Sequence, residues 1–337
     1  MTHNANSVNS APIIFGTHVA SRPGYCAGAG IGASEDRYCV EEWVMLDGTW
    51  TFAAVFDGRN GSAAADFVLK TLPPLLETSL SASLAAATHL DDKVVGDLLS
   101  DAITSVDSLI CAQFLSLVEG VALDTALDED IAVRLSASEG HAIHVANLGY
   151  CDASNYVPSL SEESPLTIQT VLYTSDQTGS SWQSQILFSL HNCRNPAEVA
   201  RLQREHSGET GAVSDKLSGL PELVDHNHMP PYLSNVPEIL HAHSSPSNAA
   251  EKFLFIASDG LCDLVERIHL DKGTPEKSLL AQPWGAVASA ARKNGKNMAV
   301  EIWDAFGGDG GDNRFQEVLD DKFVGRVDDT TIIVVPL

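Results

Sequence analysis

Four acidic segments, spread along the 337-residue chain, constrain its fold more than any other feature. Each lies where an apolar, strand-like run meets a turn, and together they cover residues 34–37, 56–58, 258–260 and 327–330. Hard divalent cations take oxygen ligands, and a pair of such ions needs several carboxylates from elements that are distant in sequence. The pattern therefore predicts a fold that brings early and late segments together at one metal site.

The chain is long and apolar enough for one large domain. Its residues are 44% hydrophobic, and no Pro-, Gly- or Ser-rich linker divides them. Residues 1–16 are rich in Asn and Ser and contain no Arg or Lys, so we predict a disordered arm followed by a single domain over 17–337. No apolar run approaches the roughly 20 residues of a membrane span, which predicts a soluble protein without membrane contact.

The net charge and the cysteine content indicate which partners and which cellular compartment to expect. A formal net charge of −25 makes a nucleic-acid partner unexpected, because a phosphate backbone is bound by a basic surface. Six cysteines without a C-x-x-C pair are typical of reduced thiols rather than of disulfides or a zinc site, so we expect a cytoplasmic location.

Strand and helix patterns alternate along the chain. The predicted strands cover residues 37–46, 50–56, 140–148, 252–257 and 330–335. The predicted helices cover residues 61–76, 93–118, 195–206, 284–293 and 297–306. Asp47-Gly48 between the first two strands is typical of a hairpin, so we predict an α+β fold with antiparallel sheets and helices outside them. Residues 157–184 and 207–234 read as loosely structured.

Four motifs in order resemble those of the type 2C metal-dependent Ser/Thr protein phosphatases, the PPM family. They are VFDG at 55–58, VANLG at 145–149, IASDGLCD at 256–263 and DDTTIIVV at 328–335. Within the family, the pyruvate dehydrogenase phosphatase branch is the most similar, through His191-Asn192 with the helix at 195–206, Pro230-Pro231-Tyr232-Leu233 and the stretch 297–329.

The resemblance implies a central β-sandwich of two antiparallel sheets, flanked by helices, with two Mg²⁺ or Mn²⁺ ions at one end. The metal ligands that it implies are Glu35, Asp57, the Gly58 carbonyl, Asp259 and Asp328. Asp57 would bridge the ions, Asp36 would orient a metal-bound water, and a phosphoprotein would be the substrate. Taken singly, an acidic residue beside Gly is usually a turn former, but the family's order favours the metal interpretation for the set.

Three positions depart from the family pattern. Arg59 replaces the His that follows Asp-Gly, Ile31 replaces an Arg that contacts the substrate phosphate, and Tyr150 replaces an Asp that binds a third metal. Arg59 either anchors phosphate in a bidentate manner or marks a site that no longer turns over.

Three hypotheses follow from these residues. The first, which we favour, is an active phosphoserine/phosphothreonine phosphatase with Asp36 and Arg59 as its catalytic side chains. The second is a pseudophosphatase that acts as a phosphoprotein-binding or regulatory module, because a general acid is worth about 10²–10⁴ in rate and none is evident. The third is a hydrolase of another phosphoester.

Two H-x-H pairs, His226 with His228 and His241 with His243, could suggest a metal clip. No cysteine or carboxylate stands at ligand spacing beside them, so the sequence favours exposed loop histidines.

Overall fold

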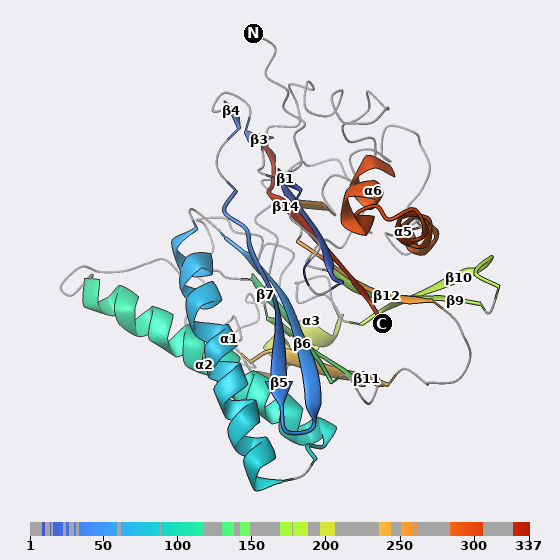
Figure 1. Cartoon of the computed structure of the whole chain (residues 1–337). Coiled ribbons are helices and arrows are strands. Elements are labelled where there is room, and N and C mark those ends of the chain that lie inside the picture. Colours follow the sequence, from blue (N-terminus) through green and yellow to red (C-terminus); the bar gives the residue numbers. More distant parts are fainter. Residues whose placement is uncertain are drawn as a thin grey trace.

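The fold consists of two antiparallel sheets packed face to face between two helix pairs (Figure 1). In this computed structural model, the described residues are 9–10, 14, 16–22, 25–26, 30–31, 34–58, 62–87, 89–117, 130–137, 142–148, 169–176, 178–187, 196–205, 236–243, 251–258, 260–261, 284–305 and 326–337. The predicted α+β sandwich flanked by helices is confirmed.

The first sheet has six strands in the order β1-β2-β14-β12-β9-β10. Their bounds are Asn9–Ser10 (β1), His18–Arg22 (β2), Thr330–Pro336 (β14), Lys252–Ala257 (β12), Gln169–Ser175 (β9) and Trp182–Ile186 (β10). Every pairing is antiparallel, and β14, the last strand of the chain, lies between β2 and β12. Both ends of the chain therefore meet in this sheet.

The second sheet has five strands in the order β11-β8-β7-β6-β5. Their bounds are Glu238–His243 (β11), Ala142–Leu148 (β8), Asp130–Ala137 (β7), Gly48–Asp57 (β6) and Arg37–Met45 (β5). The predicted Asp47-Gly48 hairpin is confirmed, since Met45 pairs with Gly48 and Gly48 has a φ of 137°. A third, small sheet joins Arg326–Val327 (β13), Tyr25–Cys26 (β3) and Gly30–Ile31 (β4).

Alternation along the strands builds three hydrophobic layers. On β6, Phe52 faces the helices while Val55 faces the other sheet; on β12, Phe255 faces helices and Leu254 faces the sheet interface. Each of these four side chains is at most 1% exposed. Strands that are buried on both faces read as continuous apolar runs, which explains why β12 and β14 are so apolar.

Helices α1 (Ala63–Ala86) and α2 (Asp92–Leu117) cover the outer face of the five-stranded sheet, and α5 (Trp284–Lys293) and α6 (Met298–Ala305) cover the other sheet (Figure 1). A further helix, α3, spans Pro196–Glu205. Helix α1 runs ten residues beyond its predicted end. Its buried leucines recur every four residues, at 72, 76, 80 and 84, and this packing carries the helix past Pro73 and Pro74.

The sequence patterns missed several strands. Residues 169–175 and 182–186 form a hairpin, so the prediction of loose structure over 157–184 is wrong for this part. The stretch 207–234 and the histidines at 226 and 228 lie outside the described residues. Of the predicted N-terminal arm, Asn9–Ser10 pairs with β2, and the boundary at residue 16 stays a prediction. None of the helices that the structure describes is long and apolar enough to cross a membrane.

Candidate metal centre

The contacts of the strand ends bring all four acidic segments to one end of the sandwich, the fourth through Ser258 and Gly260. Asp57 is the last residue of β6, and its neighbour Phe56 pairs with Arg37 at the start of β5. Glu35 and Asp36, which precede β5, are thereby placed beside Asp57. Asp57 is only 4% exposed. Two segments with acidic residues therefore share one corner of the five-stranded sheet.

Gly58 lies against the backbone of Glu35. A Cβ atom at Gly58 would stand 2.5 Å from the Glu35 carbonyl oxygen and 3.0 Å from its Cβ. Since real Cβ contacts almost never fall below 3.0 Å, only glycine fits here without a shift. The glycine that follows Asp57 thus permits the close approach of the two segments.

The third segment, before β14, is tied to the first by a hydrogen bond. The Glu35 backbone N–H donates to Asp329 Oδ2 at 2.5 Å, across 294 positions of sequence, and the Asp329 N–H donates to Asp328 Oδ1 at 3.0 Å. Gly260 packs against this turn, because a Cβ there would stand 2.0 Å from the Asp329 carbonyl oxygen. These contacts place Asp328 and Glu35 at the same corner.

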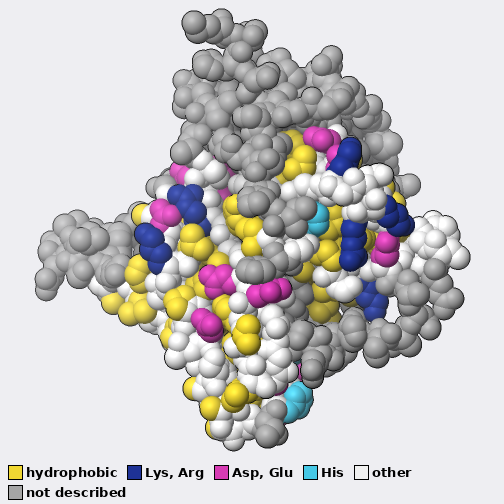
Figure 2. All heavy atoms as spheres, in the orientation of Figure 1, with side chains coloured by type: hydrophobic (Ala, Val, Ile, Leu, Met, Phe, Trp, Pro, Cys, Tyr) yellow, Lys and Arg dark blue, Asp and Glu magenta, His cyan; other side chains and the backbone are white. Residues whose placement is uncertain are grey.

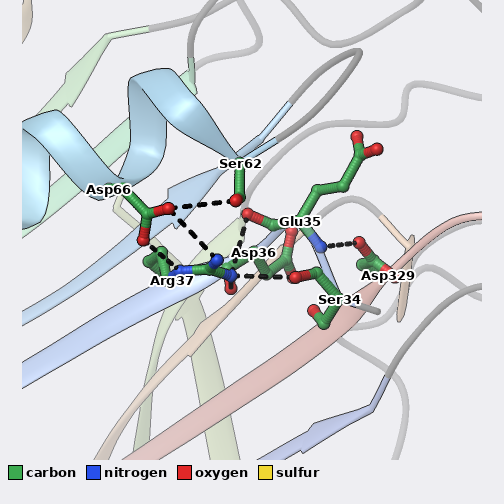
Figure 3. Close-up of polar contacts among 7 residues, drawn as sticks. All are labelled: Ser34, Glu35, Asp36, Arg37, Ser62, Asp66 and Asp329. Atoms are coloured by element: carbon green, nitrogen blue, oxygen red, sulfur yellow. Dashed lines mark hydrogen bonds and ion pairs between the residues drawn. The ribbon is translucent and has the colours of Figure 1, made fainter. Parts of the chain in front are cut away.

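Arg37 holds the first segment in shape (Figure 3). Its Nη1 donates to the carbonyl oxygens of Ser34 and Asp36, each at 2.8 Å, and its Nε donates to Asp66 Oδ1 at 2.7 Å. That hydrogen bond lowers the pKa of the Asp66 carboxyl, with help from Ser62, whose hydroxyl donates to Oδ2 at 3.0 Å. Figure 3 shows the Glu35 carboxylate pointing away from this group.

Asp36 is 5% exposed and is anchored to the six-stranded sheet. The Thr331 hydroxyl donates to Asp36 Oδ2 at 2.8 Å, and the Thr331 N–H donates to Ser258 Oγ at 2.8 Å. Thr331 of β14 and Ser258, which directly follows β12, therefore both help to orient the Asp36 carboxylate.

Glu35 has a carboxylate oxygen that lacks a hydrogen-bond donor in the described part of the chain. Its Oε2 is buried and accepts no hydrogen bond from any residue that the structure describes. A buried carboxylate oxygen without a donor is costly. The segments that carry Asp57, Gly58 and Asp328 lie at the same corner, so the donors available there are all oxygen, which suits Mg²⁺ or Mn²⁺. The residues present fit a hard divalent cation.

Other predicted site residues lie outside the described part of the chain. These are Arg59, Tyr150 and Asp259, while of Ile31 only the backbone pairing with Tyr25 is described.

Sequence reasoning missed three residues that shape the centre: Arg37, Asp66 and Asp329. Asp329 belongs to the motif at 328–335, but nothing in the sequence indicates its contact with Glu35. The pairing of Arg37 with Asp66 crosses from β5 to α1 and has no local signal in the sequence.

On the face shown in Figure 2, described Lys and Arg side chains lie in separate groups, with acidic side chains between them. The absence of a nucleic-acid partner stays a prediction.

The chain is similar to known phosphatases of type 2C. It is 25% identical over 310 residues to a protein phosphatase 2C homologue of Schizosaccharomyces pombe; this covers 82% of the chain and 65% of that relative's length. It superposes on the serine-threonine phosphatase 2C from Toxoplasma gondii with a TM-score of 0.57 and 14% identity, over 99% of this chain and 96% of the other.

A second solved structure, a sex determining protein of C. elegans, superposes with a TM-score of 0.51 and 13% identity, over 94% of this chain and 64% of the other. No family profile matches the chain. At these low sequence identities, the superpositions are evidence for the fold alone. The similarity to the S. pombe protein supports the resemblance of the sequence motifs. The chain has the fold of the protein phosphatase 2C type.

Proposed function

We propose that the chain is a metal-dependent protein serine/threonine phosphatase. The observation that carries this proposal is the buried, unpartnered Oε2 of Glu35, at a corner shared with Asp57 and Asp328. Similarity to a protein phosphatase 2C homologue supports the same function. The likeness to the pyruvate dehydrogenase phosphatase branch and a cytoplasmic location belong to this proposal.

Two ions, Mg²⁺ or Mn²⁺, would be held by the carboxylates of Glu35, Asp57, Asp259 and Asp328 and by the Gly58 carbonyl. When bound, such ions lower the pKa of a water molecule and offset the charge of a phosphoryl group. Asp57 would bridge them, and its burial at the end of β6 favours a fixed carboxylate.

The protein's own side chains would position the reactants. Asp36 would accept a hydrogen bond from the attacking water, and the Thr331 hydroxyl would hold the Asp36 carboxylate in orientation. Arg59 would bind the phosphoryl oxygens of the substrate, because its guanidinium matches their geometry and stays charged. The substrate would be a phosphoserine or phosphothreonine in a protein.

A second candidate function is a pseudophosphatase that binds metal and phosphoprotein without turnover. The identity of Arg59 and Tyr150 favours it, because neither a His nor a third-metal carboxylate stands at these positions to assist the leaving group.

Phosphate release from a phosphothreonine peptide tests the proposal. The parent protein should release phosphate with Mn²⁺ and not with chelator, and Asp57→Asn should abolish release. Asp101→Asn, a change at an exposed carboxylate on α2, is the matched control and should keep full activity.

Two outcomes of this assay separate the candidates. An inactive parent that becomes active as Arg59→His with Tyr150→Asp would identify the pseudophosphatase. Release that persists in Asp57→Asn would refute the assignment of the metal centre.

A further inference from the structure

A second group of metal-ligand side chains lies on the outer face of the five-stranded sheet. Asp92, His144 and His241 come from α2, β8 and β11, and their ligand atoms all lie within 4.8 Å of one another. We propose that this group binds one divalent transition-metal ion of the zinc type, at a site separate from the candidate metal centre.

The two histidines are direct cross-strand partners. His241 pairs with His144 in the register of β11 and β8, and their Nδ1 atoms lie 2.8 Å apart. Asp92 Oδ1 lies 3.9 Å from His144 Nδ1. Zinc bonds of about 2.0–2.1 Å at tetrahedral angles place two ligand atoms about 3.4 Å apart. These two separations differ from this value by about 0.6 Å and 0.5 Å, which small side-chain rotations supply.

The surroundings hold both imidazole rings in place. His144 is 3% exposed and stacks on Trp50, with ring centroids 6.1 Å apart and an interplanar angle of 15°. His241 packs against Gly96 of α2, where a Cβ atom would stand 3.0 Å from His241 Nε2. The glycine therefore leaves the room that the His241 ring needs beneath the helix.

Asp92 is placed by the start of α2. The preceding residue, Asp91, caps the helix, since its Oδ1 accepts the Val94 N–H at 2.8 Å. The Asp92 side chain is 38% exposed, so water can reach the group and fill a fourth ligand position. The Asp92 carboxylate thus completes a set of two imidazole nitrogens and one oxygen, which suits zinc better than Mg²⁺.

The group is distant from the candidate metal centre. His144 aligns through Leu135 of β7 with Phe52 of β6, and Asp57 stands five residues further along β6. At about 3.3 Å per residue, this separates the two places by about 16 Å. His144 also lies on the helix-facing side, as its stacking on Trp50 shows.

A bound ion would link β11, an edge strand of the five-stranded sheet, to α2. The hydrogen bond between the two Nδ1 atoms makes one of them a donor. Binding to both Nδ1 atoms requires that proton to move to Nε2 of the same ring, through solvent, with no change in net charge.

Calorimetric titration with ZnCl₂ tests the site after metal has been removed with chelator. We expect one equivalent of zinc to bind both the parent and Asp57→Asn, which lacks a key ligand of the candidate metal centre. His241→Ala should weaken this binding by at least about 100-fold, because loss of an outer hydrogen-bond partner alone costs 10- to 100-fold. Zinc at 100 times its Kd should raise the Tm by about 4 °C in the parent and in Asp57→Asn, but not in His241→Ala.

Two control variants and a second ligand variant make the titration decisive. His89→Ala removes an exposed imidazole and Asp97→Asn changes an exposed carboxylate on α2, and both should bind zinc like the parent. If His241→Ala does not fold, Asp92→Asn gives the same readout at a half-exposed side chain. Equal zinc affinity in the parent, His241→Ala and Asp92→Asn, or no zinc uptake by the parent, would show that the group is only a hydrogen-bonded histidine pair beside a carboxylate.

Discussion

Gly58→Ala should separate Glu35 from Asp57 and weaken metal binding. The added Cβ would stand 2.5 Å from the Glu35 carbonyl oxygen, and ordinary contact begins at 3.4 Å. The two backbones must therefore separate by up to about 0.9 Å. Overpacking of this kind costs about 1–3 kcal/mol.

The loss can be measured as a melting temperature and as a metal affinity. For 337 residues, the unfolding entropy is about 0.7 kcal/mol/K, so this cost should lower the melting temperature by about 1.5–4 °C. Because the shift displaces a ligand, we expect Mn²⁺ affinity and the rate of phosphate release to fall at least about tenfold. Calorimetric melting and Mn²⁺ titration of the purified variant provide both values.

Gly295→Ala separates a stability effect from a site effect. Its φ of 65° penalises alanine by about 1–2 kcal/mol, although a Cβ there meets nothing within 4 Å. This variant should melt lower but bind Mn²⁺ normally. A Gly58→Ala protein that matches the parent in both melting and Mn²⁺ affinity would refute the role of the Glu35 contact.

Three further predictions concern charge and burial. Arg37 lowers the pKa of Asp66, so the ionised Asp66 carboxylate stabilises the fold above the ordinary carboxyl pKa, and this stabilisation is lost as pH falls through the lowered pKa. In urea titrations at a series of acidic pH values, the free energy of unfolding of Asp66→Asn should therefore fall less with decreasing pH than that of the parent. Burial raises the pKa of the Cys39 thiol, so native protein at pH 8 should be alkylated at exposed Cys111 and not at Cys39, as peptide mass spectrometry can show. Asp329→Ala should cost about 1.5–3 kcal/mol in urea unfolding and weaken Mn²⁺ binding, because it removes a charged acceptor.

Local pattern predicted the bounds of one buried strand and one amphipathic helix. The strand Lys252–Ala257 and the helix Trp284–Lys293 have the bounds that their apolar runs predict. The hairpin β9–β10 was missed because Ser, Thr and Gln are interspersed among its apolar residues, and because β9 forms through pairing with β12. Tertiary pairing outweighed local propensity there.

The candidate centre was predictable as a list of residues and not as an arrangement. Asp57 and Asp328 stand in motifs, but the hydrogen bond between Glu35 and Asp329 depends on how β5 and β14 meet. The expectation that His241 is an exposed loop histidine is wrong, because His241 is half-buried in β11. Its partner His144 lies 97 residues away in the sequence. Strands that no short turn connects, such as β8 and β11, have no turn signal in the sequence to set their register.

The initial rate of phosphate release from a phosphothreonine peptide, measured over a Mn²⁺ titration, tests the central claim most directly. We predict a rate that rises from zero, saturates, and returns to zero when chelator is added. A rate that stays at zero while Mn²⁺ binds to the parent would contradict the phosphatase, and so would a rate that does not depend on Mn²⁺.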